Sequence, residues 1–281
     1  TYAPDVMLAE TLRFMEENRN RPMFIFFSTN LPHGPVDIPP EENTYAGSPA
    51  IRQAYGNASG TNRECSGAAE EYASMVDKLD RQVGAIVDQV RKLGLDKRTI
   101  IIFSSDNGHE LYYRTDKGRG RGPDCHGGVL DGTGELLDVF RGSRGRVGPN
   151  NAMANLAGLK WTSHEGGIRV PLIISWPGTL PHGKVCHSLV ANYDHMASFA
   201  DLAGIRMPEG KDAVSYMDIL SGNSSRQRDY VVVDHTVITG DGWKLTQKQN
   251  KPFLFHIGRD PEERNNLAGT RKDQLEKLRA I

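Results

Sequence analysis

Residues Thr99 to Gly108 read TIIIFSSDNG, and this stretch decides the predicted fold. Its apolar run, Ile100 to Phe103, follows a β-branched residue without alternation, which predicts a strand covered on both faces. Asp106 and Asn107 come just after it, at the end where open α/β sheets place their ligands. A carboxylate and an amide offer oxygen ligands to a hard cation. D-N-G alone is also typical of an Asx turn, so the choice depends on the rest of the chain.

A second stretch, from Lys160 to Pro171, reads KWTSHEGGIRVP and runs into the apolar segment LIISWPG. Together with D-N-G it resembles the sulfatase family within the alkaline phosphatase superfamily. In that family D-N-G is followed by K-x-x-x-x-E-G-G-x-R-x-P and another buried strand. The residues that fall on this pattern are Lys160, Glu165, Gly166, Gly167, Arg169 and Pro171.

A third motif, Pro32-His33-Gly34-Pro35, resembles the P-H-x-P turn of the family. It follows the apolar run 23–27, which predicts a first buried strand, and nearby prolines hold the segment as an extended loop. His33 could be an ordinary loop histidine, but its place after a strand favours an active-site role. The three motifs stand in the family's order, and the resemblance covers nearly the whole chain.

Composition excludes several classes of partner. The 34 basic and 35 acidic residues nearly cancel, so nothing indicates a nucleic acid or a membrane surface. No run of apolar residues is long enough for a membrane span. The three cysteines, Cys65, Cys125 and Cys186, form neither a C-x-x-C pair nor a zinc pattern, and we interpret them as structural or incidental.

Periodicity predicts an α/β fold. Apolar residues at helical spacing predict helices over 4–17 and 69–93, and the long helix between two apolar strands predicts a βαβ unit. Residues 43–67 are polar and rich in glycine, which predicts an irregular loop. Residues 110–157 lose periodicity and carry several arginines, so they form either a solvated loop or an insertion that meets an anionic substrate. His109 begins this region and is a substrate-binding candidate or a bystander.

The sequence predicts that the last part of the chain changes from long elements to short strands and short helices. A third buried strand is expected over 172–176, then a helix from Asp194 to Leu202, with Asp194 as its N-cap. Short strands are expected over 230–233, 243–246 and 253–256, followed by a helix over 272–280. The ending LFHIGRDPEERNNLA resembles the closing L-Y-D-x-x-x-D-P-x-E-x-x-N-L-A of sulfatases, with His256 where aspartate is usual.

The resemblance therefore implies a mostly parallel sheet flanked by helices, as in sulfatases and alkaline phosphatases, with a small antiparallel sheet plus helix at the C-terminus. We expect 1–222 to be part of the large catalytic domain and 223–281 to be a small α+β domain. The resemblance also implies periplasmic or secreted localisation.

The resemblance assigns roles to individual residues. Asp106 and Asn107 would hold one divalent cation, Ca²⁺ in the family. Lys160 would place a positive charge beside a sulfate oxygen, although a surface lysine is the ordinary alternative. His33 would protonate the departing alcohol. Glu165 and the glycines after it are expected to be scaffold.

Three family segments have no counterpart in the sequence. These are the C-x-P-S-R motif whose cysteine or serine becomes formylglycine, the early aspartate pair of the metal site, and the G-K-W-H segment that contacts sulfate. All three precede, in the family, the helix expected at 4–17. We therefore expect the C-terminal part of a sulfatase acting on a sulfated small molecule or glycan. The alternatives are a phosphomonoester or phosphonate hydrolase, and an inactive sulfated-glycan-binding relic.

Overall fold

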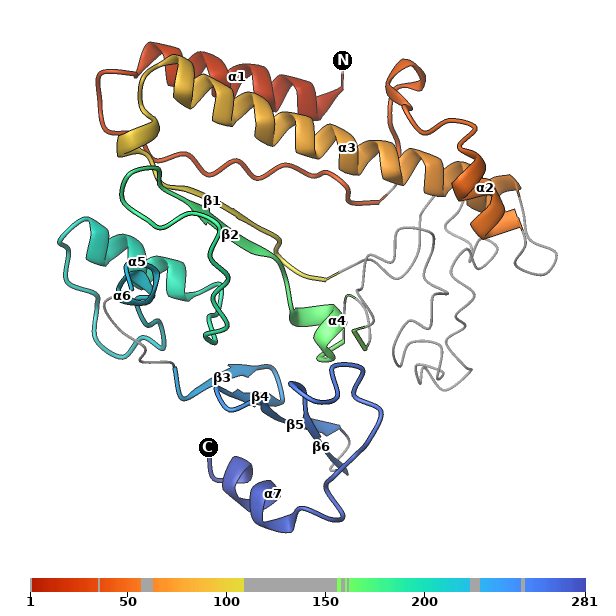
Figure 1. The fold of residues 1–281 in the computed structure, drawn as a ribbon, viewed down its shortest axis with the longest axis vertical. Coiled ribbons are helices and arrows are strands. Elements are labelled where there is room, and N and C mark those ends of the chain that lie inside the picture. The colour runs from red at the N-terminus through yellow and green to blue at the C-terminus, as the bar shows by residue number, and fades with distance from the viewer. Residues whose placement is uncertain are drawn as a thin grey trace. The chain divides into compact units, whose positions relative to one another are not determined.

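The computed structural model of the chain describes residues 2–34, 36–56, 63–108, 156–157, 160, 162–222, 228–248 and 251–281. The chain divides into two compact units, one of residues 1–101 and 109–155 and one of residues 102–108 and 156–281. Figure 1 labels the helices and strands of both units. Within the described part, no helix combines the length and the apolar character that a membrane crossing requires.

The first unit contains two long helices, α1 (Ala3–Glu17) and α3 (Arg63–Lys92), which lie side by side (Figure 1). Pro4 and Asp5 occupy the first turn of α1, where the fixed φ of proline and a negative charge both favour helix formation. Asn18 ends α1, because its backbone N–H and its Nδ2 both donate to the carbonyl of Phe14. The two helices confirm the helical periodicity of these segments.

Apolar packing and one buried amide join α1 to α3. Met15, Val90 and Leu95 are all buried and form a small core. Gln82 lies among the apolar residues on the packed face of α3 and is also buried, although it is polar. Its Nε2 donates to the carbonyl of Pro4 at 2.8 Å. A buried amide is stabilising only when it is hydrogen-bonded, so this bond fixes how the two helices lie together.

The expected strand over 23–27 is wrong, and with it the βαβ unit, because the segment has no regular secondary structure. Phe24 and Phe26 are 74% and 83% exposed. An apolar run becomes a strand only when a neighbouring strand accepts its backbone hydrogen bonds, and no described strand pairs with this one. The irregular loop expected over 43–67 is also partly wrong. This segment contains α2 (Pro49–Gly56) and the start of α3, and η1 (Pro40–Glu42) comes just before it. A further short element, η2 (Asp96–Arg98), follows α3.

Two strands expected from the sequence pair with each other. β1 (Ile101–Ser104) and β2 (Leu172–Ser175) form a two-stranded sheet in the described part of the chain, which confirms both as strands. They are not covered on both faces as expected. Residues of β1 are half-buried, and Ile173 of β2 is 61% exposed.

Three shorter helices belong to the second unit: α4 (Glu165–Ile168), α5 (Asp194–Leu202) and α6 (Met217–Leu220). The helix expected from Asp194 is confirmed, but Asp194 is its first residue and not its N-cap. The buried Asp194 carboxylate instead accepts backbone N–H groups of Ala191 and Val214, both at 2.9 Å, and pairs with Arg228 at 2.6 Å.

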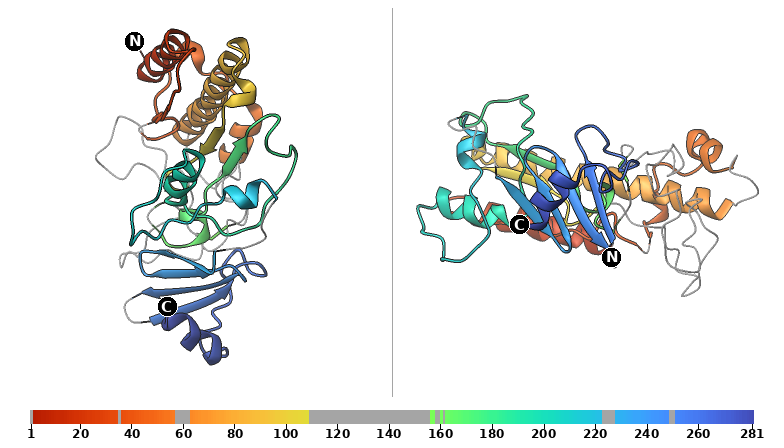
Figure 2. Two further views of the ribbon diagram at one scale, coloured as in Figure 1. Left: turned by 90° about the vertical axis from the view of Figure 1, so that its left-hand side faces the viewer. Right: turned by 90° about the horizontal axis from the view of Figure 1, so that it is seen from below.

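The end of the chain forms a four-stranded antiparallel sheet in the order β3-β4-β5-β6, with α7 on one face, as Figure 2 shows. Leu245 and Leu254 point toward α7 and pack against Leu275 and Leu278. Side chains alternate along a strand, so Lys244 points to the opposite face. The bounds are β3 (Tyr230–Val233), β4 (Thr236–Thr239), β5 (Trp243–Lys248), β6 (Lys251–His256) and α7 (Lys272–Arg279).

This sheet confirms the three expected strands and the final helix and adds β4, which the sequence did not predict. The expected domain boundary between residues 222 and 223 stays a prediction.

Candidate functional site

The loop after β1 presents the two metal-ligand candidates. Asp106 is exposed and Asn107 is half-buried. The Oδ1 of Asp106 accepts the backbone N–H of Asn107 at 2.9 Å, and the Nδ2 of Asn107 donates to the carbonyl of Gly108 at 2.8 Å. The hydroxyl of Ser105 donates to the carbonyl of Asn107 at 2.9 Å. These local bonds hold both side chains in a fixed orientation, although the Asp106 bond reaches the next residue and does not form an Asx turn, which would need the N–H two residues on.

The same bonds leave two oxygens for a ligand. No described residue donates a hydrogen bond to Asp106 Oδ2 or Asn107 Oδ1. A carboxylate oxygen and an amide oxygen are the donors that a hard cation such as Ca²⁺ takes, so the pair fits such an ion. Ca²⁺ takes about six to eight oxygens, so this pair is a minority of its ligands. The described residues include no cluster of three or more His, Cys, Asp or Glu that could complete them.

Gly108 ties the loop to α4. Its N–H donates to the carbonyl of Gly167 at 2.9 Å. A Cβ built on Gly108 would lie 1.8 Å from the carbonyl oxygen of Gly166 and 2.9 Å from the Cα of Gly167. Only a glycine allows two backbones to approach so closely, which explains why the D-N-G and E-G-G motifs occur together.

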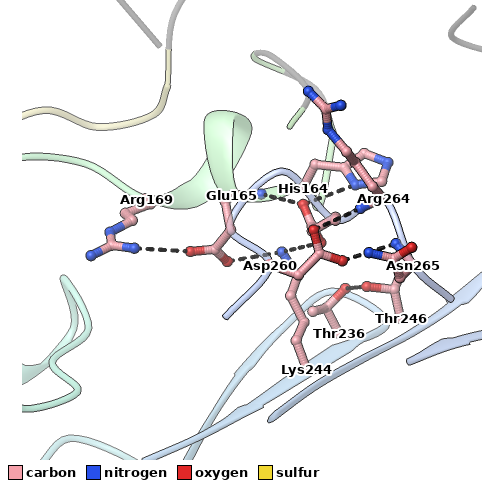
Figure 3. A network of polar contacts seen from close by, with 10 residues as sticks. His164, Glu165, Arg169, Thr236, Lys244, Thr246, Asp260, Arg264 and Asn265 are labelled. Atoms are coloured by element: carbon pink, nitrogen blue, oxygen red, sulfur yellow. Dashed lines mark hydrogen bonds and ion pairs between the residues drawn. The ribbon is translucent and has the colours of Figure 1, made fainter. Parts of the chain in front are cut away.

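A buried ionic cluster, formed by Glu165, Lys244 and Glu263, connects the first residue of α4 with β5 and with the chain after β6; Figure 3 shows the polar network around it. Lys244 is fully buried. Its Nζ donates to Glu165 Oε1 at 3.0 Å, and it lies 3.0 Å from Glu263 Oε1 in an ion pair that lacks hydrogen-bond geometry. Arg169 lies at the edge, 3.6 Å from Glu165 Oε2.

The second oxygen of Glu263 contacts the start of α4. Its Oε2 accepts the backbone N–H of Glu165 at 2.9 Å and lies 3.1 Å from His164 Nδ1. Burial alone would raise the pKa of the Glu263 carboxyl, but the His164 hydrogen bond and the Lys244 charge outweigh burial and hold that pKa below its ordinary value. The carboxylate is therefore the form that the fold stabilises.

His33, the candidate acid, belongs to the first unit. It is exposed, its backbone N–H donates to the carbonyl of Asn30 at 2.7 Å, and its Nδ1 lies 2.5 Å from the carbonyl of Gly34. The contact of Nδ1 with this carbonyl orients the imidazole ring relative to its own loop. Leu31, Val36 and Ile38 are buried on either side and anchor the loop.

Lys160, the other catalytic candidate, belongs to the second unit, as do Asp106 and Asn107. It is a half-buried turn residue, not a fully solvated lysine. His109 lies outside the described residues, as do nearly all of the arginine-rich residues that follow it. The structure therefore brings Asp106 and Asn107 together and describes His33 in the other unit.

Sequence reasoning missed Lys244 and Glu263. A lysine in a strand of alternating residues is ordinarily interpreted as a solvent-facing residue. Glu263 has the same charge as the neighbouring Glu262, so its residue type does not distinguish it as buried. One signal was present: Glu263 falls on the glutamate of the closing D-P-x-E-x-x-N-L-A pattern. It also has a φ of 49°, which is unusual for a residue other than glycine.

Comparison with known families gives two matches. The family model described as Sulfatase matches residues 1–205. A model described as N-sulphoglucosamine sulphohydrolase, C-terminal, matches residues 160–280. The second match covers α4 as well as the C-terminal sheet, so it includes all three members of the buried ionic cluster.

Individual relatives are distant but extend along the chain. The chain is 24% identical to the N-acetylgalactosamine-6-sulfatase of Canis lupus familiaris, over 98% of this chain and 50% of the relative. It is 23% identical to the N-acetylgalactosamine-6-O-sulfatase of Bacteroides thetaiotaomicron, over 98% and 49%. Among solved structures, one from work on glycosaminoglycan metabolism by B. thetaiotaomicron matches with a TM-score of 0.72 and 22% identity. That match covers 99% of this chain and 53% of the other.

The structural match shows that the fold is the α/β fold of sulfatases. The chain spans about half the length of the curated relatives that it matches. The Sulfatase model covers well over half of the sequence and includes the P-H-x-P, D-N-G and E-G-G motifs. On this evidence the chain belongs to the sulfatase family.

Proposed function

We propose that the protein of which this chain is part hydrolyses a sulfate ester of a sulfated carbohydrate, with Ca²⁺ bound by Asp106 and Asn107. The observation that carries the proposal is the pair of available oxygens, Asp106 Oδ2 and Asn107 Oδ1, on a loop fixed against α4. Its setting is a chain of the sulfatase family whose relatives are named N-acetylgalactosamine-6-sulfatases. Periplasmic or secreted localisation is part of the same proposal.

The roles of this chain's residues follow from their chemistry. A bound Ca²⁺ would supply positive charge that polarises the sulfate oxygens. Lys160 adds a point charge for another sulfate oxygen. His33 gives a proton to the departing alcohol oxygen, so that no alkoxide is released. For His109, which lies outside the described residues, a substrate contact stays a prediction.

We further propose that this chain is the C-terminal part of a longer sulfatase, and that the formylglycine nucleophile belongs to a part outside it. Its relatives are about twice as long. In addition, Ile173 of β2 is largely exposed, which is unusual for the core sheet of an α/β domain. Intact mass of the purified protein tests this. A single 31.1 kDa species that hydrolyses an aryl sulfate by itself would refute it.

The activity is tested on the complete protein with aryl sulfate and aryl phosphate in parallel. We expect the sulfate to react faster than the phosphate, and we expect removal of Ca²⁺ to abolish the activity. Asp106→Ala should lower the Ca²⁺ content and should lower the rate by about 10²–10³-fold. Asp88→Ala is the matched control, because Asp88 is a highly exposed aspartate whose ion pair with Arg91 contributes little.

Each outcome separates the alternatives. Faster turnover of the phosphate would indicate a phosphomonoester hydrolase of the same superfamily. Unchanged Ca²⁺ content in Asp106→Ala would refute the metal assignment. A complete protein that binds a sulfated glycan but hydrolyses neither ester would indicate the non-catalytic alternative.

A further inference from the structure

We propose that Lys244 and Glu263 of the second unit are positioning residues for the loop that carries Asp106 and Asn107, acting through α4. The inference rests on the proposed function, since it concerns the loop that carries Asp106 and Asn107. Among the described residues, neither has a hydrogen bond or an ion pair with that loop. Each instead fixes the backbone turn against which the loop is packed.

The first step is the charge arrangement in the buried ionic cluster. One ammonium, that of Lys244, lies 3.0 Å from each of two buried carboxylates, those of Glu165 and Glu263. Removal of Lys244 would leave two like charges in a buried site, and each would be far less stable there than in solvent. Glu165 therefore has one favourable position, beside the ammonium, and α4 begins at that residue.

The second step is the backbone bond from Glu263. Its Oε2 accepts the N–H of Glu165, one of the N-terminal amides that a helix cannot satisfy internally. Glu263 is itself held in its φ of 49° by a turn in which Asp260 accepts the N–H groups of Glu263, Arg264 and Asn265. A residue in this conformation is kept there by its surroundings, so the backbone that carries the carboxylate is fixed.

The third step joins α4 to the loop. Gly166 and Gly167 follow Glu165 directly, and the Gly167 carbonyl accepts the N–H of Gly108. The Gly166 carbonyl lies so close to Gly108 that not even a methyl group fits between them. With no space between the two backbones, a displacement of α4 moves Gly108 and the oxygens of Asp106 and Asn107 with it. Support of this kind typically changes metal affinity by about 10–100-fold.

The experiment uses the complete protein and two variants. Lys244→Met keeps the length of the side chain and removes its charge. Glu263→Gln keeps the volume but places an amide NH₂ against either the Lys244 ammonium or the Glu165 N–H. Because it leaves the opposite charges of Lys244 and Glu165 balanced, it serves as the test if Lys244→Met does not fold. Ca²⁺ affinity is measured by titration calorimetry, and loop order by hydrogen exchange of the Gly108 amide.

The matched control is Leu278→Ala. Leu278 belongs to α7 and packs against the face of the sheet opposite to Lys244, so this change removes a buried side chain and leaves the buried ionic cluster intact. We expect weaker Ca²⁺ binding, by about tenfold or more, and faster Gly108 exchange in the two cluster variants, at a temperature where all proteins are folded. We expect neither change in Leu278→Ala, even where its loss of thermal stability is as large.

The outcomes distinguish this inference from the proposed function. Unchanged affinity and exchange in the cluster variants, or equal changes in Leu278→Ala, would overturn the positioning role while leaving the metal site in place. Equal Ca²⁺ affinity of the unaltered protein and Asp106→Ala would overturn the metal site, and Gly108 exchange alone would then decide whether the cluster holds the loop.

Discussion

Gly108→Ala is the sharpest test of the contact between α4 and the loop that carries Asp106 and Asn107. The added Cβ would stand 1.8 Å from the carbonyl oxygen of Gly166, where ordinary contact begins at 3.4 Å. One backbone would therefore have to move by about 1.6 Å. No rotamer change can relieve this clash, because both partners are backbone atoms.

The expected cost has two parts. Overpacking in a fixed environment costs typically about 1–3 kcal/mol, and a clash between backbones belongs at the upper end of that range. The displacement also breaks the hydrogen bond from Gly108 to Gly167, which contributes about 1 kcal/mol. We expect a loss of about 3–4 kcal/mol in the free energy of unfolding, with weaker Ca²⁺ binding, because Asp106 and Asn107 move with Gly108.

Urea unfolding of the complete protein measures the first effect and calorimetric titration with Ca²⁺ the second. The control is Gly84→Ala in α3, where an added Cβ meets nothing within 4 Å. Alanine in an exposed helix should raise stability there by about 0.5–1 kcal/mol. If Gly108→Ala unfolds within about 0.5 kcal/mol of the unaltered protein, the close approach is wrong.

Three further predictions follow from other sites. His33→Ala should slow alkyl sulfates by about 10²–10⁴-fold and nitrophenyl sulfate far less, whereas Lys160→Ala should slow both alike; equal sensitivity to the leaving group would contradict the two roles. Because the pKa of Glu263 is lowered in the folded state, its carboxylate stabilises the protein above its ordinary pKa of 4.5. The stability difference between the unaltered protein and Glu263→Gln should therefore shrink on acidification from about pH 5 to about pH 3, and a constant difference would argue against the shift. Met15→Ala, at a buried position, should cost about 2–5 kcal/mol in urea unfolding, and Phe14→Ala, at an exposed one, much less; similar losses would refute the assigned core.

Local signals predicted the elements whose causes are local. The spacing of Leu8, Leu12 and Met15 identified α1, and the glycine-aspartate turn before Trp243 identified β5. Such elements need only their own periodicity and ends. The D-N-G and E-G-G motifs were likewise identified from their residues, although the reason for their pairing, the approach of Gly108 to Gly166, requires the structure.

The sequence failed where the cause is distant. The residues 23–27 have the composition of a strand, but composition cannot supply the neighbour with which a strand pairs. Burial of Lys244 depends on its ion pairs with Glu165 and Glu263. Glu165 lies 79 residues before Lys244 along the chain, and 98 residues separate Glu165 from Glu263. No local pattern distinguishes such a lysine from one in solvent.

The distances along the chain between these residues also determine the order in which their contacts can form during synthesis. The start of α4 obtains its bond from Glu263 only after 98 further residues have been added. At about 5–20 residues per second, translation of that interval takes roughly 5–20 s. Until then the loop with Asp106 and Asn107 lacks this support, so we expect the nascent chain to take up Ca²⁺ only after Glu263 has been added and has reached the start of α4.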